Sequence, residues 1–200
     1  MLSVITPADS PDLASLAVVK AALGISGSSE DATLSALITQ ASSAIAVACN
    51  RVLVSETVEQ TFRSSGGRRG LMLMRYPVTS IVSIIEGGVT LTASHYELDE
   101  SSGIVERIIS DRAACWSCGA ITVRYVAGYD IADVPPDLVQ AVIMLVQQYR
   151  SQASRDPMLR AVDVTDIERL EFFALTAAGL PAPVQTLIEP HYKAAHSDAV

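Results

Sequence analysis

The chain has 200 residues, of which 50% are apolar and 18% are charged, and its formal net charge is −8. This length allows one sizeable core, the apolar runs are too short to span a membrane, and the acidic balance argues against a surface that grips nucleic acid. Three cysteines and no secretory signal indicate a reducing compartment rather than a disulfide framework.

Two helices are predicted at the start of the chain. Leucines and valines recur at three- and four-residue steps across residues 12–23, and Gly24 can end that helix. A second helix is predicted from about residue 30 to residue 50, with an apolar stripe flanked by small residues that permit close packing. The short turn between them predicts an antiparallel helix hairpin within residues 1–51.

Residues 52–128 have the composition of a β region. β-Branched residues replace the helical spacing, and glycine pairs or Ser-Gly steps mark the turns. Strands are predicted at 56–64, 71–77, 79–88, 94–100, 103–108 and 120–128. They predict a small antiparallel sheet or barrel inserted between helical segments.

A long helix follows and leads into a C-terminal arm. Pro135 and Pro136 open the helix at 135–151, whose apolar residues cover more than half of its circumference, so it is expected to be central and buried. The arm, residues 152–200, is expected to start as a polar loop, with a weaker helix at 165–178 and a short one at 183–192. The prediction is one α+β domain spanning 1–200, with a helical core made by the hairpin and the long helix.

The stretch "AACWSCG" places Cys115 and Cys118 two residues apart. A redox pair of this spacing works at a helix N-terminus, where the thiol pKa is lowered, but here a strand follows. A structural zinc site would need two further ligands, and no other cysteine or histidine has partner spacing. We interpret the pair as part of a turn and Trp116 as an exposed or contact aromatic residue, with a thiol or metal site as the alternative.

No other catalytic pattern is present in the sequence. It has no phosphate-binding glycine loop and no G-x-S-x-G motif. Four carboxylates in the arm are interpreted as the solvated face of a helix rather than an acid–base or metal site: Asp163, Asp166, Glu168 and Glu171. We therefore predict no catalytic residue, no cofactor and no metal.

Two segments are candidate partner contacts. Arg68 and Arg69 follow Gly66-Gly67, and they form either a mobile hairpin tip or a contact to an acidic protein partner. The short C-terminal helix has one apolar face and follows a polar segment, and isolated helices of this length are marginal in water. We expect that face to dock on a neighbouring subunit or on another protein through Val184, Leu187, Ile188 and Tyr192.

The order of these segments resembles a known family. The matching pieces are the helix pair "LAVVKAALGI" and "DATLSALITQASSAIAVACNRVL", the strand "LMLMRYPVTSIVSIIEGG", the hairpin "SHYELDESSGIVER", the segment "ITVRYVAGYDIADVPPDLVQAVIMLVQQYR" and the close "LPAPVQTLIEPHYK". Together they resemble the head-to-tail connector proteins of tailed bacteriophages and gene transfer agents, also called adaptor or head-completion proteins. The pattern departs from the family at residues 151–179.

The resemblance implies a structural role without catalysis. Several copies, typically twelve, would form a ring beneath the portal at the neck of the virion, after assembly in the host cytoplasm. The ring would extend the DNA channel and present a platform to the next connector, a stopper or a tail protein. An acidic ring would let DNA slide through without specific binding, and no membrane is involved. Two other hypotheses are a small thiol or metal protein using Cys115 and Cys118, and a tail terminator, which the long helix argues against.

Overall fold

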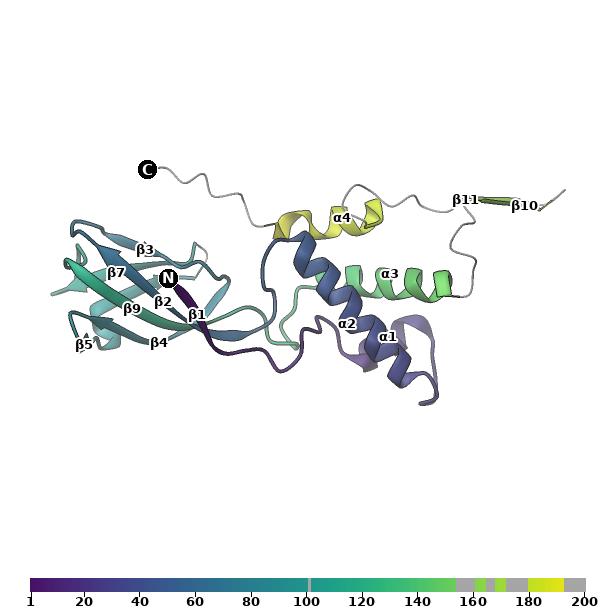
Figure 1. The fold of residues 1–200 in the computed structure, drawn as a ribbon, viewed down its shortest axis with the longest axis horizontal. Helices are drawn as coiled ribbons and strands as arrows, with labels where there is room; N and C mark the ends of the chain where they lie inside the picture. The colour runs from purple at the N-terminus through teal and green to yellow at the C-terminus, as the bar shows by residue number, and fades with distance from the viewer. Residues whose placement is uncertain (101, 154–160, 165–167, 172–179, 193–200) are drawn as a thin grey trace. The chain divides into compact units, whose positions relative to one another are not determined.

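The computed structural model describes residues 1–100, 102–153, 161–164, 168–171 and 180–192 (Figure 1). The chain divides into two compact units. A β unit comprises residues 1–10 and 52–132, and a helical unit comprises residues 11–51 and 133–200. Helices and antiparallel sheets are both present, which confirms the mixed α+β class. The expectation of one domain over 1–200 stays a prediction.

The helical unit begins with the predicted hairpin. Helix α1 spans Leu16–Leu23 and α2 spans Asp31–Ala48. Ser15 caps α1 by accepting a hydrogen bond from the Val18 N–H at 3.4 Å. Gly24 ends it, as predicted, in the left-handed conformation with φ of 66°, which a residue without a Cβ adopts at no steric cost. Lys20 forms an ion pair with Asp31 across the connecting turn.

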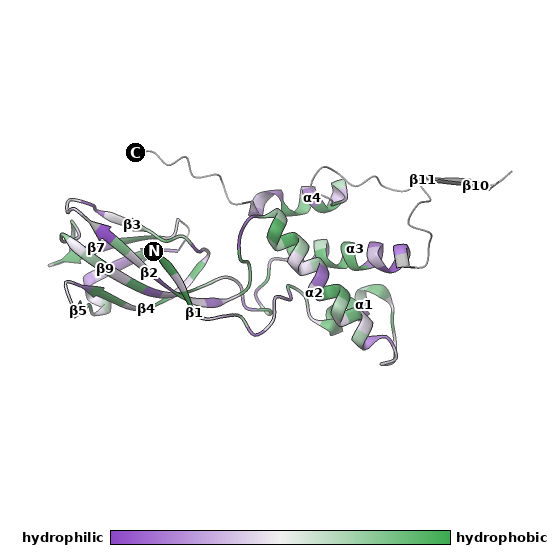
Figure 2. Ribbon diagram, in the orientation of Figure 1, coloured by the Kyte–Doolittle hydropathy of each residue, from purple (hydrophilic) through white to green (hydrophobic). Residues whose placement is uncertain are grey.

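The rest of the helical unit comes from the second half of the chain. Helix α3 spans Pro136–Ala153, α4 spans Ala182–Ile188, and the 3₁₀ turn η2 spans Glu189–His191. The long helix was therefore predicted correctly. The apolar residues of these helices (Figure 2) bury a common core. Its members include Val19, Leu34, Ile38, Ile45, Leu138, Val142, Leu145, Val146, Val184 and Ile188.

The β unit contains two antiparallel sheets. The five-stranded sheet has the order β1 (Leu2–Thr6), β2 (Glu56–Ser64), β9 (Gly119–Ala127), β4 (Val78–Glu86) and β5 (Val89–Thr90). The second sheet has the order β3 (Gly70–Met72), β7 (Ile104–Ile109) and β6 (Tyr96–Asp99), and β8 (Arg112–Ala114) pairs with β7. A 3₁₀ turn η1 (Ala93–His95) precedes β6. Among the described residues, no helix is long and apolar enough to cross a membrane.

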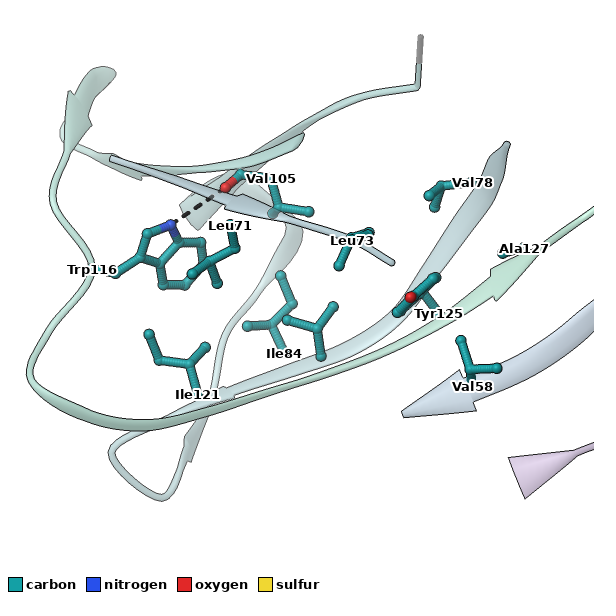
Figure 3. Packing of buried hydrophobic residues seen from close by; sticks show 11 residues of the cluster. Val58, Leu71, Leu73, Val78, Ile84, Val105, Trp116, Ile121, Tyr125 and Ala127 are labelled. Atoms are coloured by element: carbon teal, nitrogen blue, oxygen red, sulfur yellow. Dashed lines mark hydrogen bonds between the residues drawn. The ribbon is translucent and has the colours of Figure 1, made fainter. Parts of the chain in front are cut away.

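Side chains from both sheets form one core (Figure 3). Trp116 is only 1% exposed, and its indole N–H donates to the carbonyl of Val105 at 3.3 Å. The expectation that Trp116 is an exposed or contact residue is therefore wrong. Its large apolar ring fills the core next to Leu71 and Ile121, and its one polar atom has an acceptor there.

Buried polar groups fix the segment after β3. Gln60 lies on β2, and its side-chain carbonyl accepts hydrogen bonds from the Met74 N–H at 2.9 Å and the Tyr125 hydroxyl at 3.0 Å. The same hydroxyl accepts from the Arg75 N–H at 3.2 Å, and Arg75 pairs with Glu56 at 3.1 Å. Buried polar groups need such partners, so the network holds residues 74–75 against the inner face of the five-stranded sheet.

The structure differs from the predicted elements in several strands and in one helix. Strands β1, β5 and β8 were not predicted, and the strand expected at 71–77 is limited to β3. The helix expected at 165–178 is also wrong where it can be checked, since β11 (Glu168–Glu171) pairs with β10 (Ala161–Val164). Alternation of apolar and charged residues in "ERLE" suits a strand as well as a helix. The remainder of that predicted helix lies outside the described residues.

Candidate partner-contact surfaces

Cys115 and Cys118 lie in the loop between β8 and β9, and both are exposed free thiols. The Cys118 thiol donates to the Ser65 carbonyl at 3.2 Å. In the described part of the chain, no group of three histidine, cysteine or carboxylate side chains could hold a metal ion. The loop connects β8 to β9, and the expectation that the cysteine pair has no thiol or metal role stays a prediction.

This cysteine loop is attached to the arginine loop of residues 65–69. The backbone N–H of Trp116 donates to the Arg68 carbonyl at 2.8 Å, which adds to the contact between Cys118 and Ser65. The loops meet because β2 ends where β9 begins, with Ser64 opposite Gly119. The two loops therefore form one end of the β unit.

An ion pair between Glu86 and Arg107 supports the cysteine loop at that end. Glu86 at the end of β4 accepts from the Ser117 N–H at 2.8 Å and from the Arg107 guanidinium at 2.8 Å. Burial alone would raise the pKa of Glu86, but these hydrogen bonds and the Arg107 charge hold it below its usual value. Arg107 also lies over the Trp116 ring, 5.9 Å from its centroid. This ion pair was not predicted from the sequence, because pairing between β4 and β7 residues has no local sequence signal.

Arg68 and Arg69 are exposed on this end, and neither side chain has an ion-pair partner among the described residues. Arg63 and Arg112 share that property, whereas Arg75, Arg107, Arg124 and Arg150 each pair with a glutamate. Arg63, Arg68, Arg69 and Arg112 lie in the described part of the β unit, on segments next to the two loops. We call these four arginines the basic end.

The C-terminal candidate residues have different environments. Val184 and Ile188 are fully buried in the helical unit, where α4 packs on α3. Leu187 is half-buried, and Tyr192 is 40% exposed. The apolar face of α4 therefore already has an intramolecular partner. Among these four residues, Leu187 and Tyr192 keep side-chain surface that another protein could contact.

Polar contacts hold the end of the described chain against α3. His191 and Asp137 pair at 2.7 Å, and Arg51 donates to the His191 carbonyl at 3.4 Å. Burial alone would raise the pKa of Asp137, but hydrogen bonds from His191 and the Leu138 N–H keep it lowered. This attachment through His191 and Arg51 was also missed, because the partners are 54 and 140 residues apart.

The acidic candidates of the arm are only partly described. Asp163 lies in β10, and Glu168 and Glu171 lie in β11, so these three are not on a helix face. Asp166 lies outside the described residues.

The chain was compared with known proteins. The model of the family described as "Head completion protein" matches residues 12–193. No curated protein matches the chain.

A chain from the neck of a native GTA particle, computed with C12 symmetry, is 20% identical with a TM-score of 0.60. A chain from the neck of an empty GTA particle, computed with C6 symmetry, is 20% identical with a TM-score of 0.58. A chain from the virion of a native gene transfer agent particle is 21% identical with a TM-score of 0.58. Each match covers 98% of this chain and 96% of the other chain, so the fold is shared over nearly the full length.

Proposed function

Because the chain belongs to the head completion protein family, we propose that it is a head-to-tail connector of a tailed phage or phage-like particle. The family resemblance inferred from the sequence is thereby confirmed. The observation that carries the proposal is the family match over residues 12–193, and the fold shared with neck chains of GTA particles supports it.

The connector forms a ring beneath the portal, extends the DNA channel and presents a docking surface to a stopper or tail protein. A ring is supported by the C6 and C12 symmetry with which the similar necks were computed. Twelve copies are the expectation. With a net charge of −8 on each copy, the channel repels DNA, so that DNA slides through it without specific binding. The role is structural, no catalytic activity is assigned to it, and the site of action is the neck of the virion after assembly in the host cytoplasm.

The chain acts as one connector domain in this proposal. The segment 1–51, which holds the helix hairpin after strand β1, and the long helix predicted at 135–151 enclose the β insertion 52–128 in sequence, and the C-terminal arm 152–200 follows. The order supports this, because residues of the helical unit lie on both sides of residues 52–132.

The Arg68–Arg69 loop at the basic end contacts an acidic protein surface, for which the portal is the candidate. Arg68 and Arg69 support this because their guanidinium groups are exposed and free of carboxylates among the described residues. An arginine without a partner is available for bidentate pairing with a carboxylate. Leu187 and Tyr192 form the second candidate contact.

The test is binding to the isolated portal of the same phage or element. Full-length protein should co-sediment with the portal and form rings visible by electron microscopy. Arg68→Glu with Arg69→Glu should weaken this binding at least tenfold, whereas Arg63→Glu with Arg112→Glu, an equal change of charge, should have a smaller effect. Failure of the unmodified protein to bind the portal would overturn the connector role. Equal losses in both double variants would show that general charge acts, not the Arg68–Arg69 loop.

A further inference from the structure

The five-stranded sheet of the β unit has two open edges. Strand β1 forms one edge, and among the described residues only β2 pairs with it. At the other edge, β5 pairs with Ile85 and Glu86 alone, so residues 78–83 of β4 have no strand on their outer side in the described part of the chain. An open edge presents unpaired backbone donors and acceptors, and a strand from another chain can pair with them.

Both edges lack the charges that usually protect such strands. Residues 2–6 read "LSVIT" and residues 78–85 read "VTSIVSII", with no lysine, arginine, aspartate or glutamate in either. Apolar side chains are exposed on both: Val4 is 47%, Ile5 46% and Val82 55% exposed. β1 is accordingly coloured as largely apolar in Figure 2. Isolated monomers usually place charges or proline at such edges.

Each edge also has a β-bulge at an exposed apolar residue. Ile5 is the extra residue between the pairs Val4–Val58 and Thr6–Thr57, and Val82 is the extra residue between Ile81–Tyr125 and Ser83–Arg124. A bulge increases the local twist and redirects a side chain. A bulged edge is a poor template for arbitrary strands, so a partner strand must follow the same twist.

The strand directions suit a second copy of this chain as the partner. Neighbouring strands from β1 through β2 and β9 to β4 are antiparallel, so β1 and β4 run in opposite directions. If β4 of one copy lies beside β1 of the next, the alternation continues without a break. The two surfaces differ, so the contact is heterologous, and a heterologous contact closes into a ring when its rotation fits.

The charge of the chain favours the same choice. Each copy has a net charge of −8, so copies repel one another over most of their surface. Uncharged edges allow contact without placing carboxylates against carboxylates. We propose that copies of this protein join edge to edge, with residues 78–83 of β4 against β1 of the next copy and Val82 packed near Val4 and Ile5. This inference rests on the proposed ring.

Crosslinking tests the contact directly. In a full-length chain carrying Cys115→Ser and Cys118→Ser, Ile5→Cys is combined with Val82→Cys, and a short bismaleimide is added after assembly on the isolated portal. A ladder of covalent multimers is expected, because every copy has both partners. Ile5→Cys alone and Val82→Cys alone should give no multimers, and their mixture should stop at dimers.

The matched control replaces Val82→Cys by Ile109→Cys, which lies in β7 of the other sheet and is 50% exposed. A ladder with Ile109→Cys would overturn the proposal. Dimers from Ile5→Cys alone would also overturn it, because they would show a two-fold contact between β1 strands. Rings seen by electron microscopy without the Ile5–Val82 ladder would overturn the edge contact and leave the connector role intact. Absence of portal binding and of rings in the unmodified protein would overturn both.

A charge on the edge gives an independent readout. Val82→Lys should reduce ring formation at least tenfold at unchanged melting temperature, since the side chain is exposed in one copy but covered in the ring. Val82→Thr keeps the branched shape without charge and should assemble normally. Normal assembly of the Lys variant would contradict the proposal.

Discussion

Trp116 decides how well the loop end of the β unit is packed. Trp116→Ala should lower the free energy of unfolding by about 3–5 kcal/mol, because it removes a buried ring and leaves the Val105 carbonyl without its donor. Trp116→Phe should cost less. Urea unfolding followed by circular dichroism measures both. Val89→Ala is the control, since Val89 is 64% exposed and should change stability by no more than about 0.5 kcal/mol. A stable alanine variant would remove Trp116 from the core.

The three cysteines should differ sharply in reactivity. Cys115 and Cys118 are exposed, whereas Cys49 is buried and burial raises its pKa to about 11. At pH 8 two thiols should therefore react quickly with a disulfide reagent, and Cys49 should react only on unfolding, because the thiolate is the nucleophile. Its folded-state pKa is above the ordinary 9.0, so the fold loses the corresponding stability as pH rises from about 9 to about 11.

The same residues predict that Cys115→Ser with Cys118→Ser folds and assembles normally. Neither side chain is part of the buried core, and only the weak hydrogen bond from Cys118 to Ser65 is altered. Melting temperature and portal binding should match the parent. Bound zinc in the parent, or loss of particle assembly in a folded double variant, would favour the thiol or metal hypothesis instead.

At the scale of elements, helix α3 contains two apolar residues, Ile143 and Leu145, that differ in burial. Leu145 is 1% exposed, and Leu145→Ala should cost about 2–5 kcal/mol through lost transfer energy and a cavity. The sequence pattern treated Ile143 as equally buried, but it is only half-buried, so Ile143→Ala should cost clearly less. Thermal or denaturant unfolding of the pair measures the difference. Equal, small effects would place α3 at a surface.

Much of the secondary structure was predictable because its signals are local. The helices α2 and α3 carry apolar residues at helical spacing, and β2 was predicted with its observed bounds, 56–64. Strand β1 was missed because its hydrogen-bond partner, β2, lies more than fifty residues away. The five residues of β1, which precede a proline, carry no signal of that partner. Strand β8 is three residues long and depends on its hairpin with β7. Short strands are specified by their partners rather than by their own sequence.

The candidate contacts were predictable in part for the same reason. A glycine pair followed by two arginines indicates an exposed loop, and Arg68 and Arg69 are exposed. The burial of Val184 and Ile188 was not predictable, because an apolar helix face looks the same whether α3 of its own chain or another protein covers it. That Trp116 and Glu86 support the arginine loop also follows only from the strand pairing.

Burial of α4 changes what a C-terminal truncation should do. The sequence analysis placed the helical core in the hairpin and the long helix, upstream of Gly179, but Leu180, Val184 and Ile188 are at most 3% exposed. The truncation should therefore lower the stability of the helical unit, seen by circular dichroism, while fluorescence of Trp116, the single tryptophan, changes less. Tyr192→Ala is the better test of docking, because it removes exposed surface and leaves the core in place. Unchanged helical stability after truncation would show that α4 does not belong to that core.

At the scale of the whole molecule, salt should act in opposite directions on the two proposed contacts. Copies with a net charge of −8 repel one another, and the edges of the five-stranded sheet contain no charge. Raising salt from about 0.05 M to about 0.5 M shortens the Debye length from roughly 14 Å to roughly 4 Å. Screening should then strengthen self-association through β1 and β4.

Binding of Arg68 and Arg69 to an acidic partner should weaken under the same change, because it depends on attraction between opposite charges. Sedimentation of the free protein at raised concentration measures the first effect, and co-sedimentation with the portal measures the second. Self-association that weakens with salt would show that ion pairs join the copies, and would move the contact from the sheet edges to the basic end.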